Sequence, residues 1–377
     1  MNIAELTGDE APMTVGRVGE EVVLETLRAA VDPHNSAVTG TSMDLGPGDD
    51  AALLTATAGA QLVLTTDTMS EGQDFRREWW LGSAELSATA GESAEKWAMD
   101  VGTKAAAQNL SDINAMGAVP TALLVSLTLP ADLPVQWVKD FYRGVIRACQ
   151  QPGAQRCVIA GGDLGTGDQI SVTITAVGEL PRGAEGQPAG GLRRSGATAG
   201  DVLAICGPLG RAAAGLAFLE MPRDELTDPE KLQHLDQHAD LLAQVLTAQQ
   251  RPTPPLTAGP AARAAGATAA MDISDGLLRD AGRLARSSEV RIELDDDALL
   301  AEARTLEPIA TAVGSTPDQA LSWVLSGGEE YALLASFPAV VELPEGFRRI
   351  GTVADANGAP GVITGSAVES IGWDSLA

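Results

Sequence analysis

This sequence contains few lysines and few of the side chains that bind metals through nitrogen or sulfur. Its 377 residues include three histidines, three cysteines and four lysines. The cysteines lack metal-site spacing and there is no H-E-x-x-H motif, so a zinc hydrolase is not expected. A G-x-x-x-x-G-K-[ST] loop is also missing, which excludes a P-loop nucleotide site.

Positive charge is in deficit over the whole chain. The formal net charge of −26 at pH 7 argues against nucleic acid or an anionic membrane as a partner. Any phosphate ligand would have to be neutralised by something other than lysine. A divalent metal held by carboxylates is the obvious candidate, because Mg²⁺ prefers oxygen ligands.

Long apolar runs are missing too. No stretch approaches the length needed to cross a bilayer, and residues 1–16 lack the basic-then-apolar pattern of a signal peptide. The odd number of cysteines favours a reduced, cytoplasmic protein with inert buried thiols. A length of 377 residues and a hydrophobic content of 45% predict a globular chain of two domains.

Helical and strand periodicities alternate along the chain, which predicts an α/β fold with mixed sheets. We expect an N-terminal domain at 1–182, a linker rich in Gly, Pro and Ala at 183–200, and a C-terminal domain at 201–377. The expected helices are 15–30, 98–117, 135–150, 211–219, 234–249 and 276–286, and the expected strands are 51–54, 61–66, 121–129, 157–161, 169–179, 201–206, 267–273, 290–294 and 331–337.

Aspartates recur at the ends of the predicted strands. Asp67 follows "QLVLTT", Asp163 follows "CVIAGG", and Asp272 follows "ATAAM". In "GPGDDAALL", Asp50 stands just ahead of another apolar run. Because a buried carboxylate is costly unless it is paired or binds metal, this pattern predicts several Mg²⁺ ions and a reaction in which two polyanions meet.

A helix carries a further carboxylate. In "NLSDINAMGA", Asn109 and Asp112 are three positions apart and therefore share a face. Asp is a poor residue for a helix interior, which favours a functional role for Asp112. Two aspartates have simpler alternative interpretations: Asp275 as the N-cap of the helix after it, and Asp163 as a turn residue.

Seven strings occur in family order across residues 46–331: "GPGDDAAL", "TTDT", "VGTKAAAQNLSDINAMGA", "GGD", "RRSGATAGD", "DISDGL" and "SGGEEY". In these strings the chain resembles the thiamine-monophosphate kinase family, which shares a superfamily with aminoimidazole ribonucleotide synthetase and selenophosphate synthetase. The resemblance implies ATP-dependent phosphorylation of thiamine monophosphate to thiamine diphosphate. It also implies a homodimer that pairs through the N-terminal sheets, with ATP in a cleft near the interface.

The resemblance also assigns roles residue by residue. The implied Mg²⁺ ligands, with two threonines assisting, are Asp50, Thr65, Thr66, Asp67, Asp112, Asp163, Asp272 and Asp275. The implied ATP contacts are Gly162, Asp163, Arg194 and Ser274, and the substrate side is assigned to Asp74, Glu329 and Trp373. Asp67 and Asp112 are the residues on which we expect catalysis to depend most.

Two departures from the family pattern lie on the substrate side. The family commonly has His-Phe where this chain has Asp74-Phe75, and "GWDHF" or "GYDHF" where this chain has "GWDSL". Two alternatives therefore stay open: a superfamily enzyme with another acceptor, and a non-catalytic homologue that binds nucleotide or metal. Trp79, Trp80 and Trp97 bracket an excursion at 81–96, and we interpret them as packing anchors for it rather than as a cover that closes over thiamine.

Overall fold

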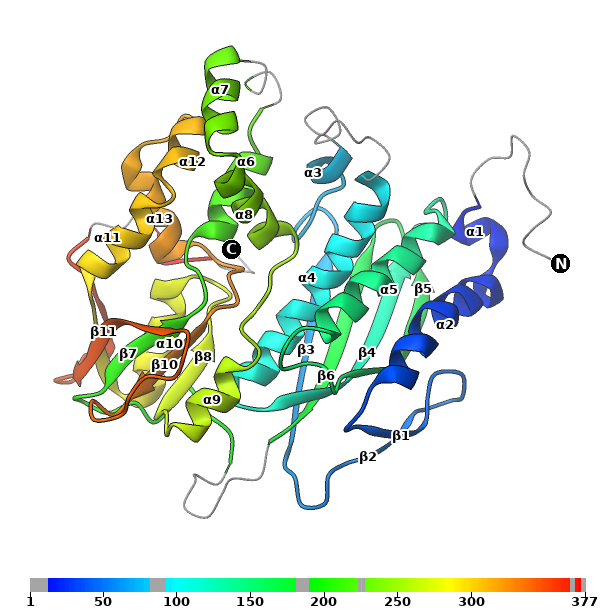
Figure 1. The fold of residues 1–377 in the computed structure, drawn as a ribbon, viewed down its shortest axis with the longest axis horizontal. Helices are drawn as coiled ribbons and strands as arrows, with labels where there is room; N and C mark the ends of the chain where they lie inside the picture. Colours follow the sequence, from blue (N-terminus) through cyan, green and yellow to red (C-terminus); the bar gives the residue numbers. More distant parts are fainter. Residues whose placement is uncertain are drawn as a thin grey trace.

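The computed structural model describes residues 13–81, 93–180, 190–222, 225, 228–366 and 370–373. Most of the predicted excursion and residues 183–189 of the predicted linker lie outside these ranges. Two sheets form the centre of the fold, and the strands of one precede the segment 183–200 in the chain while those of the other follow it (Figure 1). The expected α/β class with mixed sheets is confirmed, and we propose the domain division at that segment.

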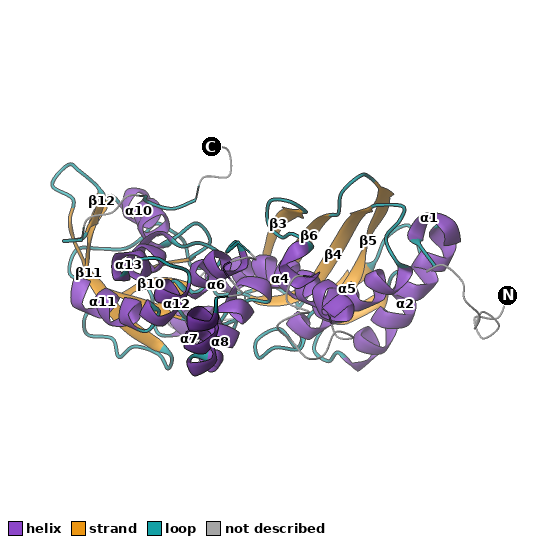
Figure 2. Cartoon of the chain, turned by 90° about the horizontal axis from the view of Figure 1, so that it is seen from above, coloured by secondary structure: helices purple, strands orange, loops and turns teal. Residues whose placement is uncertain are grey.

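The first sheet has the order β3-β6-β4-β5, in which β4 and β5 are parallel and the other pairs antiparallel. Its strands are β3 (Leu62–Ser70), β4 (Val119–Leu129), β5 (Val158–Thr166) and β6 (Ser171–Glu179). Three long helices cover one face of this sheet, and Figure 2 shows them all on the same side: α2 (Glu20–Ala37), α4 (Ser93–Ala115) and α5 (Val135–Cys149). The short helices α1 (Val15–Val18) and α3 (Glu78–Leu81) and the hairpin β1 (Ser42–Leu45) and β2 (Leu53–Thr55) complete this half.

Helices α4 and α5 pack closely because each carries a glycine that faces the backbone of the other. A Cβ on Gly102 of α4 would lie 2.0 Å from the carbonyl oxygen of Phe141, and a Cβ on Gly144 of α5 would lie 2.0 Å from that of Met99. The core there includes Leu123 from β4. On the opposite face of the sheet, leucine and threonine side chains are exposed.

The second sheet has the order β12-β9-β11-β7-β10-β8, and only β9 and β12 pair in parallel. Its strands are β7 (Val202–Cys206), β8 (Ala269–Asp272), β9 (Val290–Leu294), β10 (Leu333–Phe337), β11 (Phe347–Asp355) and β12 (Gly361–Ile363). Its helices are α6 (Arg211–Leu219), α7 (Pro229–Gln237), α8 (Ala239–Gln250), α9 (Ala258–Ala264), α10 (Leu277–Ser288), α11 (Asp296–Arg304), α12 (Glu307–Ala312) and α13 (Pro317–Ser326). Every residue of β8 and β10 is buried, as in a sheet covered on both faces.

Two predicted strand ends are wrong. β3 continues through Asp67 to Ser70 because its backbone pairs with β6 as far as Ser171. β5 likewise continues through Asp163 to Thr166, paired with β4. Polar residues that alternate between the two faces of a sheet can extend a strand, and the end of an apolar run therefore does not mark its end.

Three other expectations have a clear outcome. The helix predicted at 234–249 is two helices that meet at His238, and the helix predicted at 15–30 is interrupted at Gly19 and extends to Ala37. All three cysteines are free and buried, as expected. Among the described residues, no helix combines the length and hydropathy needed to span a membrane.

Candidate active site

A cavity of about 1030 Å³ opens between the two halves of the fold. Nine of the residues predicted to be functional line it: Asp67, Asp74, Asp112, Arg194, Asp272, Ser274, Asp275, Glu329 and Trp373. They come from β3, α4, β8 and five connecting or terminal segments, and are far apart in sequence. The structure therefore brings together most of the set that the sequence predicted.

Helix α4 lies between the two sheets and positions three of the carboxylates (Figure 1). Thr65 of β3 donates a hydrogen bond of 2.5 Å to Asp112 Oδ2, and the Asp67 amide donates one of 3.1 Å to Asn109 Oδ1. On the other side, Ser111 donates a hydrogen bond of 3.0 Å to Asp272 Oδ2. Asn109 and Asp112 therefore share a face toward β3, as their spacing predicts.

The electrostatics of these carboxylates show mutual repulsion. Burial, and then the Asp112 carboxylate, raise the pKa of Asp67 to about 6. Burial and Asp112 also raise the pKa of Asp272 to about 7, although the Ser111 hydrogen bond and Arg194 oppose the shift. Such shifts are what burial, reinforced by a neighbouring carboxylate, causes in an acidic side chain.

The cavity wall is rich in acid and poor in base. Among its described residues the acids are Asp67, Asp74, Asp112, Glu220, Asp272, Asp275 and Glu329, and the bases are Arg76 and Arg194. This donor set suits a hard divalent cation. Within the described residues, no three His, Cys, Asp or Glu side chains are close enough to hold one ion by themselves. An ion here would take its remaining ligands from water and from a bound phosphate, as Mg²⁺ commonly does.

The loop "DISDGL" is organised by a residue that the sequence analysis missed. Asp280 of α10 accepts hydrogen bonds from the amides of Ser274 (3.1 Å) and Asp275 (2.9 Å). Arg283 then pairs with both Asp275 (2.5 Å) and Asp280 (2.8 Å). The alternative reading of Asp275 as an N-cap is wrong, since Gly276 occupies that position. Asp280 and Arg283 are three positions apart in an amphipathic helix, and this spacing could have indicated from the sequence that they pair with each other next to the loop.

The loop "SGGEEY" packs directly on "DISDGL". The Glu329 amide donates a hydrogen bond of 2.7 Å to the Ser274 carbonyl, and a Cβ on Gly328 would lie 2.4 Å from the same oxygen. Trp373, 57% exposed, also attaches to this loop, because its amide donates a hydrogen bond of 2.9 Å to the Asp275 carbonyl. One loop therefore positions both Glu329 and Trp373 at the cavity.

Five predicted residues do not line the cavity of this chain: Asp50, Thr65, Thr66, Gly162 and Asp163. Thr66 hydrogen-bonds Thr175 on the sheet face opposite the helices, and Asp163 is exposed on β5. Asp50 is exposed in the β1–β2 hairpin. Thr65 is also outside the lining but acts on it through Asp112.

Comparison with known proteins identifies the family. Residues 48–180 match the family model described as AIR synthase related protein, N-terminal domain. The thiamine-monophosphate kinase of Mycobacterium tuberculosis is 38% identical over 347 residues, which is 92% of this chain and 88% of the relative. The one from Corynebacterium glutamicum is 34% identical over 342 residues, 90% and 87% of the two chains. This chain belongs to the thiamine-monophosphate kinase family.

Solved structures of that family have the same fold. The thiamine-monophosphate kinase of Stenotrophomonas maltophilia K279a superposes with a TM-score of 0.65 at 29% identity, covering 96% of this chain and 99% of the other. A structure described as AaThiL complexed with AMPPCP and TMP gives a TM-score of 0.64 at 28% identity, covering 97% and 99%.

The Asp74 departure from the family pattern has a local explanation. Asp74 Oδ2 accepts a hydrogen bond of 2.6 Å from the Ser70 amide, so this carboxylate closes its own turn. Burial, with a smaller contribution from Glu329, raises the pKa of Asp74 despite that hydrogen bond. The three tryptophans are buried, and Trp80 Nε1 donates to Asp100 Oδ2 at 2.9 Å. All three pack in the core of the first half, as packing anchors would, and Trp79 also lines the cavity.

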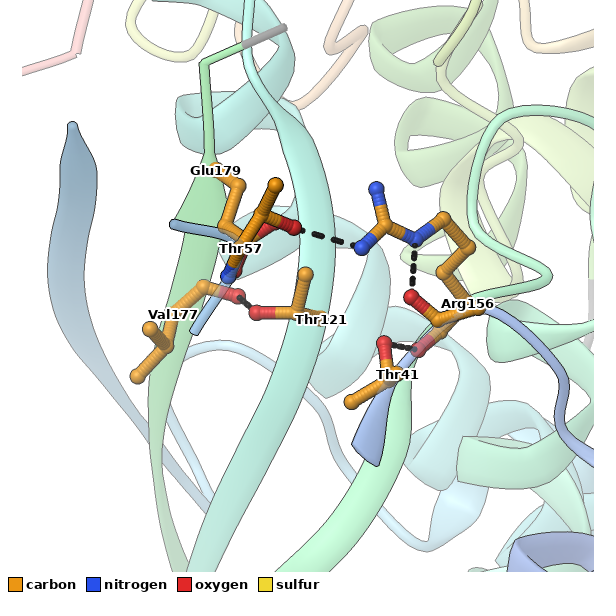
Figure 3. Close-up of polar contacts among 7 residues, drawn as sticks. Thr41, Thr57, Thr121, Arg156, Val177 and Glu179 are labelled. Atoms are coloured by element: carbon orange, nitrogen blue, oxygen red, sulfur yellow. Dashed lines mark hydrogen bonds and ion pairs between the residues drawn. The ribbon is translucent and has the colours of Figure 1, made fainter. Parts of the chain in front are cut away.

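The hairpin that carries Asp50 is anchored at both ends (Figure 3). At its start, Thr41 donates a hydrogen bond of 2.6 Å to the Arg156 carbonyl. At its end, Glu179 accepts hydrogen bonds from the Thr57 amide (2.8 Å) and hydroxyl (2.6 Å), and pairs with Arg156 at 3.2 Å. Burial alone would raise the pKa of Glu179, but these hydrogen bonds hold it below its usual value.

Proposed function

We propose that this chain transfers the γ-phosphoryl group of ATP to the phosphate of thiamine monophosphate, producing thiamine diphosphate and ADP. One observation carries the proposal: in a member of this family, Asp67, Asp112 and Asp272 meet in one large cavity. The solved relative with AMPPCP and TMP supports the same pair of ligands.

We propose that Mg²⁺ ions bind between Asp67, Asp112, Asp272 and Asp275. The excess of carboxylates over cations in the cavity and the raised pKa values of Asp67 and Asp272 fit such ions. When bound, Mg²⁺ neutralises the charges of the two phosphate groups that must approach each other. Thr65 and Ser111 then fix the directions in which the carboxylates of Asp112 and Asp272 point.

The remaining residues supply binding and orientation. Arg194 and Ser274 would contact ATP, while Asp74, Glu329 and Trp373 would form the acceptor end of the cavity. The acceptor phosphate is already anionic near neutral pH, since the second pKa of a phosphate monoester is about 6. No general base is therefore required, and positioning with charge neutralisation is sufficient for the transfer.

We also propose a homodimer that pairs through the open face of the first sheet (Figure 2). Three leucines are exposed on its strands: Leu62 (50%), Leu64 (66%) and Leu124 (42%). A face with this much exposed apolar surface is typical of a protein interface. Thr66, Gly162 and Asp163, which do not line the cavity, are on strands of this sheet, and we propose that they act beside the interface, as does Asp50 on the adjoining hairpin.

The decisive experiment incubates purified protein with ATP, Mg²⁺ and thiamine monophosphate and detects thiamine diphosphate by chromatography. Product is expected only when all three are present. Thiamine in place of its monophosphate is the matched control, because it lacks the acceptor phosphate. Nucleotide binding without product would contradict the proposed acceptor, and failure of both would contradict the kinase assignment.

A further inference from the structure

Lys104 is a buried cation in the same helix as the candidate metal ligands, and the function proposed so far gives it no role. Only 1% of its side chain is exposed. Lys104, Gln108 and Asp112 are at positions i, i+4 and i+8 of α4 and therefore form one row along the helix. Gln108 and Asp112 line the cavity, and Asp112 is a proposed Mg²⁺ ligand. Lys104 therefore lies about two helical turns from that ligand on the same row.

The amine of Lys104 joins two substrate-side segments. Its Nζ lies 2.6 Å from Glu329 Oε1 and donates a hydrogen bond of 3.0 Å to the carbonyl oxygen of Asp74. Gln249 of α8 completes the arrangement, donating a hydrogen bond of 2.8 Å to Glu329 Oε2. Both carboxylate oxygens of Glu329 are therefore held, one from each half of the fold.

The backbone of Glu329 is constrained as well. Its φ is +62°, a left-handed conformation that is uncommon for a non-glycine residue, and its amide is bonded to Ser274. With the backbone fixed, the direction of the side chain depends on Lys104 and Gln249. Removing the amine would leave the Glu329 carboxylate without its ion-pair partner, beside the Asp74 turn.

We propose that Lys104 is a positioning residue for the phosphate acceptor, acting through Glu329 and the carbonyl of Asp74. This inference rests on the proposed function, because it concerns the acceptor end of the same cavity. Lys104 itself does not line the cavity. Its contribution is to hold Glu329 in one orientation and the turn at 70–74 in one place, so that the acceptor meets a preformed surface.

The test compares Lys104→Met, Lys104→Arg and Glu329→Gln, with Lys96→Met as the control from an exposed position on the same helix. Lys104→Met should raise KM for thiamine monophosphate by about 10- to 100-fold, the usual effect of losing a supporting residue. KM for ATP should stay within about two-fold, and Lys104→Arg should recover part of the loss because it restores the charge. Lys96→Met should match the wild type.

Combining the substitutions separates positioning from a general structural role. If Lys104 acts through Glu329, adding Glu329→Gln to Lys104→Met should change KM for the acceptor by much less than the product of the single effects. An unchanged acceptor KM in Lys104→Met, or equal rises in both KM values, would overturn the inference. Should Lys104→Met not fold, an acceptor KM that stays at the wild-type value in both Lys104→Arg and Glu329→Gln would overturn it instead. A wild-type chain that makes no thiamine diphosphate would overturn the proposed function, and the inference with it.

Discussion

Ser111 and Asp272 are 161 positions apart, yet the hydroxyl of one donates a hydrogen bond of 3.0 Å to the carboxylate of the other. This contact joins helix α4 to the end of strand β8, and the residue after Ser111 is Asp112. Two carboxylates from different halves of the chain are in this way held beside each other.

Ser111→Ala should weaken Mg²⁺ activation, most of all at low pH. The Ser111 hydrogen bond lowers the pKa of Asp272, so its loss should raise that pKa further above about 7. Because metal binding needs the ionised carboxylate, the Mg²⁺ concentration for half-maximal rate should rise about 10- to 100-fold. Ser42→Ala is the control, since Ser42 makes an exposed hydrogen bond to Asp44. Equal Mg²⁺ requirements in the two variants would contradict the role of Ser111.

Asp112→Asn should remove activity and leave the fold intact. The amide oxygen of Asn can still accept the hydrogen bond from Thr65, but it carries no charge for a metal. Residues that only support a metal ligand typically cost up to roughly 100-fold in activity when they are replaced. Losing a ligand itself should therefore lower kcat at saturating Mg²⁺ by at least about that factor. Asp168→Asn, at an exposed position outside the cavity, should keep wild-type turnover. Near-normal kcat in Asp112→Asn would show that the metal assignment is wrong.

Stability without metal should fall as the pH rises. The folded-state pKa values of Asp67 (about 6), Asp272 (about 7) and Glu330 (about 7) all lie above their ordinary values of 3.8, 3.8 and 4.5. The folded state therefore binds these protons more tightly than the unfolded state. The free energy of unfolding should decrease between about pH 4 and pH 7 and then level off.

Added Mg²⁺ should oppose that loss, because it binds the ionised carboxylates. Thermal unfolding should show a larger Mg²⁺-induced rise in Tm at pH 8 than at pH 5.5. Glu330→Gln is the control, since Glu330 does not line the cavity. It should flatten the metal-free pH dependence without changing the Mg²⁺ effect. A Mg²⁺ effect of equal size at both pH values would contradict this prediction.

Glu179→Gln should loosen the hairpin that carries Asp50. The Gln side chain cannot satisfy both Thr57 donors and Arg156 together, so we expect a loss of about 1–3 kcal/mol in stability. The Glu179 pKa is lowered in the folded state, so its contribution is present above about pH 4.5, its ordinary value, and disappears as the pH falls below it. Hydrogen exchange across residues 42–57 should quicken while α4 stays protected.

The matched control for this prediction is Glu293→Gln, which breaks an Arg291–Glu293 pair that is partly exposed to solvent. Such surface pairs contribute little, so this variant should exchange like the wild type. Unchanged exchange at residues 42–57 in Glu179→Gln would contradict the anchoring role.

Leu64→Glu should convert the proposed dimer to a monomer. Leu64 is 66% exposed on the open sheet face, so a charge there should oppose pairing of two copies without disturbing the core. Light scattering after size-exclusion chromatography should report halved mass. Val340→Glu, at a residue 95% exposed outside the strands, should keep the wild-type mass. A monomeric wild type would contradict the interface.

Sequence reasoning was most successful where local geometry fixes the answer. The spacing of Asn109 and Asp112 predicts a shared helix face, and both side chains do contact β3. Residue-by-residue resemblance added Ser274, Glu329 and Trp373, which all line the cavity. The first success rests on helix periodicity. The second rests on short family motifs, within which each residue has a fixed position relative to the others.

Register and long-range pairing could not be read from the sequence. The chain alone does not show that β3 continues past Asp67, since this depends on the partner strand β6. Nor does it reveal that Lys104 meets Glu329, or that Asp280 organises the loop at Ser274.

Composition and helical periodicity are enough to establish the supply of carboxylates, the shortage of cations and the helix face that carries Asp112. The folded chain was needed to show which of those charges meet and which, like Asp163, lie away from the cavity. The physical reason is that periodicity is set by neighbouring residues along the chain. The direction of a buried charge is set instead by the partner that compensates it, and that partner comes from a distant segment.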